Sequence, residues 1–208
     1  MGRKDVIKNV VFDLGAVLYG IEYERLRVSF EELVTIHRGR MFSLSILSEN
    51  ALFREFERGK IGTFEFCEGM REIMNCKATD GEIKTAWNGL LVGVIAENVA
   101  VVEELRRKVR LVLLSNANVV HYEAIKEEIK PLLGCFEKVY FSQQIGMRKP
   151  DSEVFEYVLK ECGFVASETL FIDDTLANIK GAQGVGIQTI HLTKPSELRG
   201  EIVRRMGG

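Results

Sequence analysis

Four short polar segments of this chain carry side chains that could hold a metal ion beside a phosphate group. The segments are Asp13 to Gly15, Ser115 with Asn116, Lys149, and Asp173 with Asp174 and, one helical turn later, Asn178. Carboxylates supply the hard oxygen ligands that Mg²⁺ prefers, while a hydroxyl and an ammonium group can bind phosphate oxygens. If the chain folds so that these segments meet, the residue types predict a site for phosphoryl chemistry.

Each segment on its own has an ordinary structural explanation. An aspartate that follows a buried strand usually caps a helix or forms a turn. Ser115 with Asn116 could begin the next helix, and Lys149, which precedes a proline, could lie in an exposed loop. Four such segments in order, each following an apolar run, favour a functional site over four separate coincidences.

Five short apolar runs would form the strands that position these segments. They span residues 6–12, 109–114, 138–141, 169–172 and 187–191. Each run is apolar nearly throughout, which is typical of strands buried on both faces of a parallel sheet. Helical patterns lie between the later runs, so an α/β fold with a parallel sheet is predicted. Ligands of such sheets bind at the carboxyl ends of the strands, where the polar segments lie.

The connection between the first and second runs is too long for a loop and one helix. Apolar residues recur in it at helical spacing, at Leu26, Phe30, Leu33 and Val34 and again at Phe66, Met70, Ile73 and Met74. Thr79 and Glu82 have the spacing of a capping box at the start of a further helix. We therefore expect a helical domain at residues 18–92, inserted into a core made of residues 1–17 and 93–208.

The amino-acid composition of the chain argues against several classes of protein. The chain has 208 residues, 46% of them hydrophobic, with 28 basic and 30 acidic residues. That apolar content argues against disorder, and the lack of excess positive charge argues against nucleic acid as a partner. No apolar run is long enough to cross a membrane, the first nine residues lack an apolar signal core, and the four cysteines are scattered. A cytoplasmic protein is expected, of an oligomeric state that the sequence does not predict.

The order Asp13, Ser115, Lys149, Asp173-Asp174 resembles the four motifs of the haloacid dehalogenase (HAD) superfamily. The resemblance implies a Rossmann-like three-layer sandwich, and the early insertion is similar to that family's cap of the first type. The strings around Gly146 to Pro150 and Phe171 to Ile179 are most similar to α-D-glucose-1-phosphate phosphatases and to the phosphatase domain of soluble epoxide hydrolases. The resemblance therefore implies a Mg²⁺-dependent phosphatase that acts on a small phosphorylated metabolite, with a sugar phosphate as the expected substrate.

The resemblance also implies a role for each residue. Asp13 would be the nucleophile and would form an aspartyl-phosphate. Mg²⁺ would be held by the carboxylates of Asp13 and Asp174 and by the backbone carbonyl of Gly15. Asp173 and Asn178 would orient these groups through hydrogen bonds, as residues outside the set of metal ligands.

Three further residues would bind the phosphoryl group. Ser115 would donate its hydroxyl, Asn116 would contribute beside it at the start of the helix, and Lys149 would supply positive charge between Asp13 and the phosphate. Ser115 and Lys149 would thus act in both catalysis and substrate binding.

Gly15 departs from the pattern, because most phosphatases of this superfamily have an aspartate there as general acid and base. A sugar 1-phosphate would suffer least from its loss, since an anomeric hydroxyl leaves more readily than an ordinary alcohol. Two alternatives stay open at this point. One is a metal-independent haloacid dehalogenase, and the other is a catalytically weak HAD fold that serves as a binding or regulatory protein.

Overall fold

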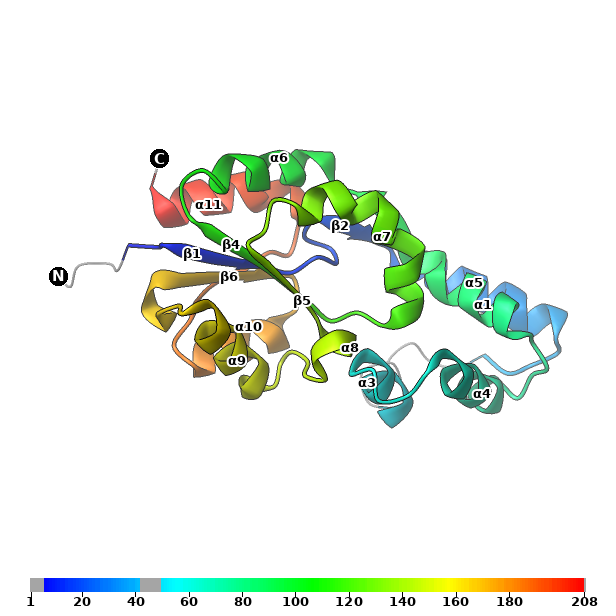
Figure 1. Ribbon diagram of the computed structural model, residues 1–208. Helices are drawn as coiled ribbons and strands as arrows, with labels where there is room; N and C mark the ends of the chain where they lie inside the picture. Colours follow the sequence, from blue (N-terminus) through cyan, green and yellow to red (C-terminus); the bar gives the residue numbers. More distant parts are fainter. Residues whose placement is uncertain (1–5, 42–49, 208) are drawn as a thin grey trace.

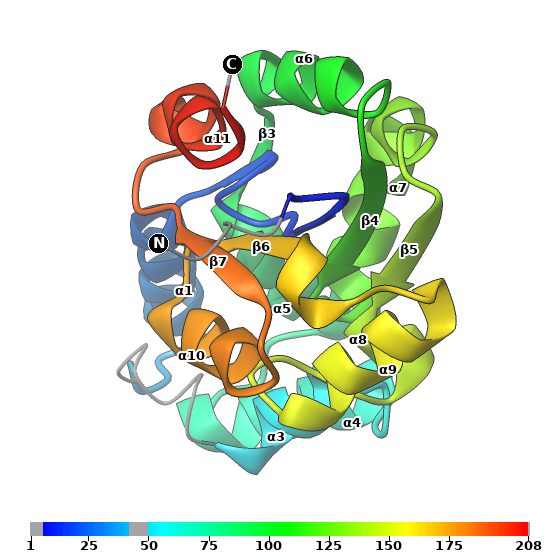
Figure 2. The same cartoon turned by 90° about the vertical axis from the view of Figure 1, so that its left-hand side faces the viewer.

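A five-stranded parallel sheet forms the centre of the molecule (Figures 1 and 2). The computed structural model describes residues 6–41 and 50–207. The strands are β1 (Asn9–Phe12), β4 (Arg110–Ser115), β5 (Lys138–Phe141), β6 (Thr169–Asp173) and β7 (Gln188–His191), in the order β5-β4-β1-β6-β7. Every neighbouring pair is parallel, which confirms the sheet expected from the apolar runs.

Helices cover both faces of this sheet, as Figure 2 shows in an end-on view. One face carries α6 (Ala96–Leu105), α7 (Val119–Leu133) and α11 (Leu198–Met206), and the other carries α9 (Ser152–Cys162) and α10 (Leu176–Gly184). Successive residues of β1 alternate between the layers, with Val10 and Phe12 in one core and Val11 in the other. Both faces of each central strand are therefore buried, which explains their uninterrupted apolar sequences. Short connecting helices complete this part: α8 (Ser142–Ile145), η2 (Ala166–Glu168) and η3 (Pro195–Glu197).

A second group of helices lies beyond the carboxyl end of the sheet (Figure 1). They are α1 (Tyr23–Ile36), α3 (Ala51–Glu57), α4 (Thr63–Met74), α5 (Asp80–Trp87) and the short η1 (Asn88–Leu90). Their apolar faces form a hydrophobic cluster of their own, which includes Leu26, Phe30, Phe66 and Met70. The capping box of α5 is confirmed, because the Thr79 hydroxyl accepts from the Glu82 N–H while the Glu82 carboxylate accepts from the Thr79 N–H.

Two strands that the sequence analysis does not predict connect these helices to the sheet. They are β2 (Tyr19–Ile21) and β3 (Leu91–Val94), which pair in antiparallel fashion. They are short and lie some seventy residues apart in the chain, so no local turn signal marks their pairing. The chain thus enters and leaves the helical group through this one ribbon. No helix in the described part of the chain is long and apolar enough to cross a membrane.

Candidate active site

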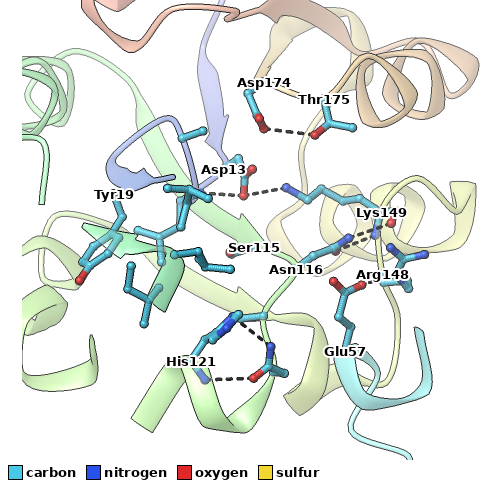
Figure 3. Close-up of a pocket in the computed structure, with 18 of the residues that line it drawn as sticks. Asp13, Tyr19, Glu57, Ser115, Asn116, His121, Arg148, Lys149, Asp174 and Thr175 are labelled. Atoms are coloured by element: carbon cyan, nitrogen blue, oxygen red, sulfur yellow. Dashed lines mark hydrogen bonds and ion pairs between the residues drawn. The ribbon is translucent and has the colours of Figure 1, made fainter. Parts of the chain in front are cut away.

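The polar segments meet at the carboxyl edge of the sheet, where they line a pocket of about 330 Å³ (Figure 3). Asp13 follows β1, Ser115 ends β4, and Asp173 ends β6, so these residues come from neighbouring strands. The helical group supplies the opposite wall of the pocket, through side chains that include Phe53, Phe56 and Trp87. The structure therefore brings the sequence-predicted residues together between the core and the inserted helices.

Lys149 lies at the centre of a buried charge cluster. Its ammonium nitrogen is 2.8 Å from Asp13 Oδ1 and 2.6 Å from Asp173 Oδ2, and its side chain is 1% exposed. Asp13 Oδ1 also accepts a hydrogen bond from the Leu14 N–H, whereas Oδ2 makes no hydrogen bond with the described residues. One oxygen of Asp13 is thus fixed in place, and the other is available to a ligand.

Asp173 and Asp174 are adjacent in sequence but differ in their surroundings. Asp173 is fully buried, and its two oxygens accept from Lys149, from the Asn178 side chain and from the Thr175 N–H. Asp174 lines the pocket, and its side chain accepts only from the Thr175 hydroxyl among the described residues. Its backbone carbonyl accepts from His191 Nε2, which gives the histidine at the end of β7 a positioning role.

Burial dominates the electrostatics of this cluster. It raises the pKa of Asp13 to about 7 against the opposing effect of Lys149, and the nearby Asp173 adds to the rise. Burial also raises the pKa of Asp174, again with help from Asp173. For Lys149, burial lowers the pKa, but the Asp13 and Asp173 carboxylates outweigh it and raise the pKa above its ordinary value. Lys149 is therefore firmly charged, whereas burial opposes the ionisation of Asp13 and Asp174.

The donor set fits a magnesium ion. Oxygen atoms of Asp13, Asp173 and Asp174 all lie within 4.8 Å of one another. Oxygens on opposite sides of one Mg²⁺ are about 4.2 Å apart, so the spacing is close to that of a coordination shell. When all three carboxylates are ionised, they face one lysine ammonium, and two negative charges stay uncompensated. A divalent cation would balance them.

Ser115 and Asn116 occupy the next strand end. Ser115 is 3% exposed and lines the pocket beside Asp13. The Asn116 side chain donates to the Lys149 carbonyl and accepts from the Lys149 N–H, both at 2.9 Å. Asn116 therefore clamps the backbone of the lysine, a function that its position after a strand does not reveal.

Gly15 lines the pocket, and neither its backbone conformation nor the space around it requires a glycine. Its φ lies outside the left-handed region, and a Cβ added there would meet only Ile21 Cγ1, at 3.5 Å. The backbone and the surrounding space at this position would accept a side chain. The absence of the aspartate is consequently a difference in chemistry and not a requirement of the turn.

Several pocket residues are missing from the sequence analysis of the site. Glu57 comes from the end of α3, and Arg148 precedes Lys149; their side chains form an ion pair at 2.8 Å. His121 of α7 stacks on Trp87, donates from Nε2 to the Trp87 carbonyl and accepts at Nδ1 from Asn118. Arg148 could have been suspected because it adjoins Lys149, but no sequence signal marks a side chain from the inserted helices.

Comparison with known proteins agrees with this geometry. A family model for haloacid dehalogenase-like hydrolases matches residues 7–186. The chain is 31% identical to a D-ribitol-5-phosphate phosphatase of Bacteroides thetaiotaomicron, over 95% of this chain and 97% of that protein.

Solved structures extend the comparison. A HAD family enzyme of Bacteroides thetaiotaomicron in complex with magnesium and inorganic phosphate superimposes with a TM-score of 0.74 at 32% identity, covering 88% of this chain and 93% of the other. A HAD-like family hydrolase of Porphyromonas gingivalis gives a TM-score of 0.84 at 30% identity, over 98% and 99% of the two chains. With a family model that spans most of the sequence and relatives that match it nearly from end to end, the chain belongs to the haloacid dehalogenase-like hydrolases and is an enzyme of that family.

Proposed function

We propose that this enzyme is a Mg²⁺-dependent phosphomonoester hydrolase that acts through an aspartyl-phosphate on Asp13. The observation that carries the proposal is the cluster at the carboxyl edge of the sheet. Asp13 has one oxygen fixed by Lys149 and Leu14 and one that is open to the pocket, and Asp174 faces the same space. A nucleophilic carboxylate, a fixed cation and further carboxylates for a metal are the groups that phosphoryl transfer to an aspartate needs.

Asp13, Asp174 and the backbone carbonyl of Gly15 would hold the metal ion. When bound, Mg²⁺ would offset the repulsion between the attacking carboxylate and the phosphate dianion. Asp173 is the weaker candidate for a direct ligand, since both its oxygens are occupied by Lys149, Asn178 and Thr175. Its contribution, with that of Asn178, is to fix the ammonium group of Lys149.

Side chains of the protein carry out the remaining steps. The open oxygen of Asp13 attacks phosphorus, the bond from phosphorus to the ester oxygen breaks, and the leaving alkoxide takes up a proton from solvent water, because Gly15 offers no acid. Lys149, the Ser115 hydroxyl and the backbone beside Asn116 bind the phosphoryl oxygens as their charge redistributes. Water then attacks the phosphorus of the aspartyl-phosphate, which releases inorganic phosphate and restores the Asp13 carboxylate.

For the substrate, we propose a small sugar or polyol phosphate. The pocket of about 330 Å³ suits a molecule of that size, and the similar enzyme of Bacteroides thetaiotaomicron is named for D-ribitol 5-phosphate. The motif resemblance to glucose-1-phosphate phosphatases points to the same class of compound. Within this class, Gly15 favours sugar 1-phosphates over polyol phosphates, because the usual acid is missing and an anomeric hydroxyl leaves more readily.

Neither alternative function explains the site as well. A metal-independent dehalogenase has no need of Asp174 beside Asp173 in a cluster with two uncompensated negative charges. A binding or regulatory protein has no need of a nucleophile whose free oxygen is held at an accessible pocket. Metal-dependent hydrolysis of a phosphate ester would distinguish a phosphatase from both alternatives.

The test is a phosphatase screen over sugar, polyol and aryl phosphates, with Mg²⁺ and with excess chelator. We expect phosphate release only with the metal, and none from Asp13→Asn, which removes the nucleophile with little change of volume. Circular dichroism and thermal unfolding establish that the variant is folded. Release of phosphate at the wild-type rate by folded Asp13→Asn protein would refute the mechanism.

A further inference from the structure

The ion pair between Glu57 and Arg148 lies in the pocket wall, on the other side of Asn116 from Asp13 in the view of Figure 3. Glu57 belongs to the inserted helices, and Arg148 belongs to the core. Arg148 Nε donates to Glu57 Oε2 at 2.8 Å. The pair therefore joins the two parts of the molecule in the wall of the pocket that also contains Asp13.

Three contacts fix the position of Glu57. The Ser142 hydroxyl donates to the Glu57 carbonyl at 2.6 Å, and the neighbouring Arg58 pairs with Asp151 of the core at 2.6 Å. Gly59 has φ +65° and approaches α8 so closely that a Cβ would lie 2.3 Å from the Gln143 carbonyl oxygen. The end of α3 is thus docked on the core by its backbone as well as by side chains, and the Glu57 carboxylate is preorganised.

The pair keeps polar atoms free for a ligand. Glu57 Oε1 and both terminal nitrogens of Arg148 make no hydrogen bond with the described residues, and the two side chains are 31% and 18% exposed. Both residues line the pocket, so one strong acceptor and several donors are available there for a ligand. A hydroxyl group, which both donates and accepts, is the ligand group that such a set satisfies.

The net charge of the Glu57–Arg148 pair determines which polar ligand groups this wall attracts. Glu57 neutralises Arg148, so this wall offers little attraction to a carboxylate or to a second phosphate. The adjoining wall is apolar, formed in part by Phe53, Phe56 and Trp87, and suits the carbon skeleton between hydroxyl groups. The wall therefore matches a neutral chain that carries hydroxyls.

We propose that Glu57 and Arg148 bind hydroxyl groups of the substrate's alcohol portion, so that the enzyme selects monophosphates of polyhydroxylated carbon chains over those of simple alcohols. This inference rests on the proposed phosphatase function and adds to it the residues that determine specificity. Glu57 accepts from a hydroxyl at Oε1, and Arg148 donates to a neighbouring hydroxyl from its terminal nitrogens. Neither residue takes part in bond breaking at phosphorus.

The experiment compares two substrates of the same chain length, ribitol 5-phosphate and 1,5-pentanediol monophosphate, which lacks the interior hydroxyls. Wild-type enzyme with Mg²⁺ should have the higher kcat/KM for ribitol 5-phosphate. In Glu57→Gln the ratio of the two kcat/KM values should fall by about 10- to 100-fold, the usual range for one hydrogen bond to a charged group. The loss should appear mainly in KM. Arg148→Gln gives an independent second measurement should Glu57→Gln prove unstable.

Glu55→Gln is the matched control, because Glu55 lies on the same helix and pairs with Arg58 and Lys60 outside the pocket. It should leave the ratio unchanged. A ratio that is also unchanged in folded Glu57→Gln and Arg148→Gln would overturn the inference and leave the phosphatase function intact. An equal fall of kcat on both substrates with an altered pH profile would assign Glu57 to proton transfer and overturn it as well. Failure of the wild type to release phosphate from either ester and from the sugar and aryl phosphates of the screen would instead refute the proposed function on which it rests.

Discussion

Gly15→Asp tests whether the supply of a proton to the leaving group limits this enzyme. Most phosphatases that this chain resembles have an aspartate two residues after the position of Asp13, the proposed nucleophile, and this chain has Gly15 there. The structure allows the substitution, because the φ of Gly15 is outside the left-handed region and the new Cβ would make an ordinary contact of 3.5 Å with Ile21. We therefore expect a folded protein with no backbone strain at this position.

The size of the effect follows from the role of a general acid, which typically contributes about 10²–10⁴-fold. The added carboxyl group would join a site in which Asp13 and Asp174 already have raised pKa values, and their negative charge favours its protonated form. A proton donor helps a poor leaving group most, so kcat/KM should rise for primary-alcohol phosphates and change little for sugar 1-phosphates and aryl phosphates. We expect the ratio of primary-alcohol to anomeric substrates to rise about 100- to 1000-fold, the lower half of that range.

The assay measures kcat/KM for both kinds of ester at saturating Mg²⁺, in wild type, Gly15→Asp and Gly15→Asn. The asparagine variant has nearly the same shape and no acidic proton, so it separates proton supply from a change in space. An equal fractional change for primary-alcohol and anomeric phosphates, in a folded variant that is still activated by Mg²⁺, would refute the reasoning. A rise of the same size in the ratio of primary-alcohol to anomeric kcat/KM in Gly15→Asn would also refute the reasoning.

Three further predictions concern the metal, the docked helix and a buried histidine. Asp174→Ala should raise the Mg²⁺ concentration needed for half-maximal activity more than Asp173→Ala does, because Asp174 faces the pocket, and metal titrations of activity compare the two. Gly59→Ala should lower the free energy of unfolding by about 1–3 kcal/mol, since Gly59 has φ +65° and a Cβ would lie 2.3 Å from a carbonyl oxygen of α8. Urea unfolding measures this, with Gly184→Ala as the control at a position where nothing lies within 4 Å. Burial lowers the pKa of His121 from 6.5 to about 4, so the unfolded chain binds a proton first as the pH falls. The free energy of unfolding should then drop by up to about 3 kcal/mol between pH 6.5 and pH 4, and His121→Gln should flatten that dependence in urea titrations.

Local patterns were enough to predict the central sheet and the helical insertion. The apolar runs that became β1, β4, β5, β6 and β7 are continuous because both faces of each strand are covered, and that requirement is visible in the sequence. The capping box at Thr79 is likewise a local signal. Because parallel strands present their carboxyl ends at one edge, the same patterns predicted that Asp13, Ser115 and Asp173 would meet.

Contacts between distant segments could not be predicted in this way. The pairing of β2 with β3 joins short segments with no turn between them, and the ion pair of Glu57 with Arg148 joins residues that are 91 positions apart. The different surroundings of Asp173 and Asp174 depend on which carboxylate Lys149, Asn178 and Thr175 reach. Periodicity and motifs reflect interactions between residues that are close in the sequence. The contacts between distant segments depend instead on how whole helices and strands pack together. Asp13 and Lys149, the proposed nucleophile and its partner, could therefore be predicted from the sequence, whereas the pocket wall with Glu57 and Arg148 forms only where the inserted helices pack against the core.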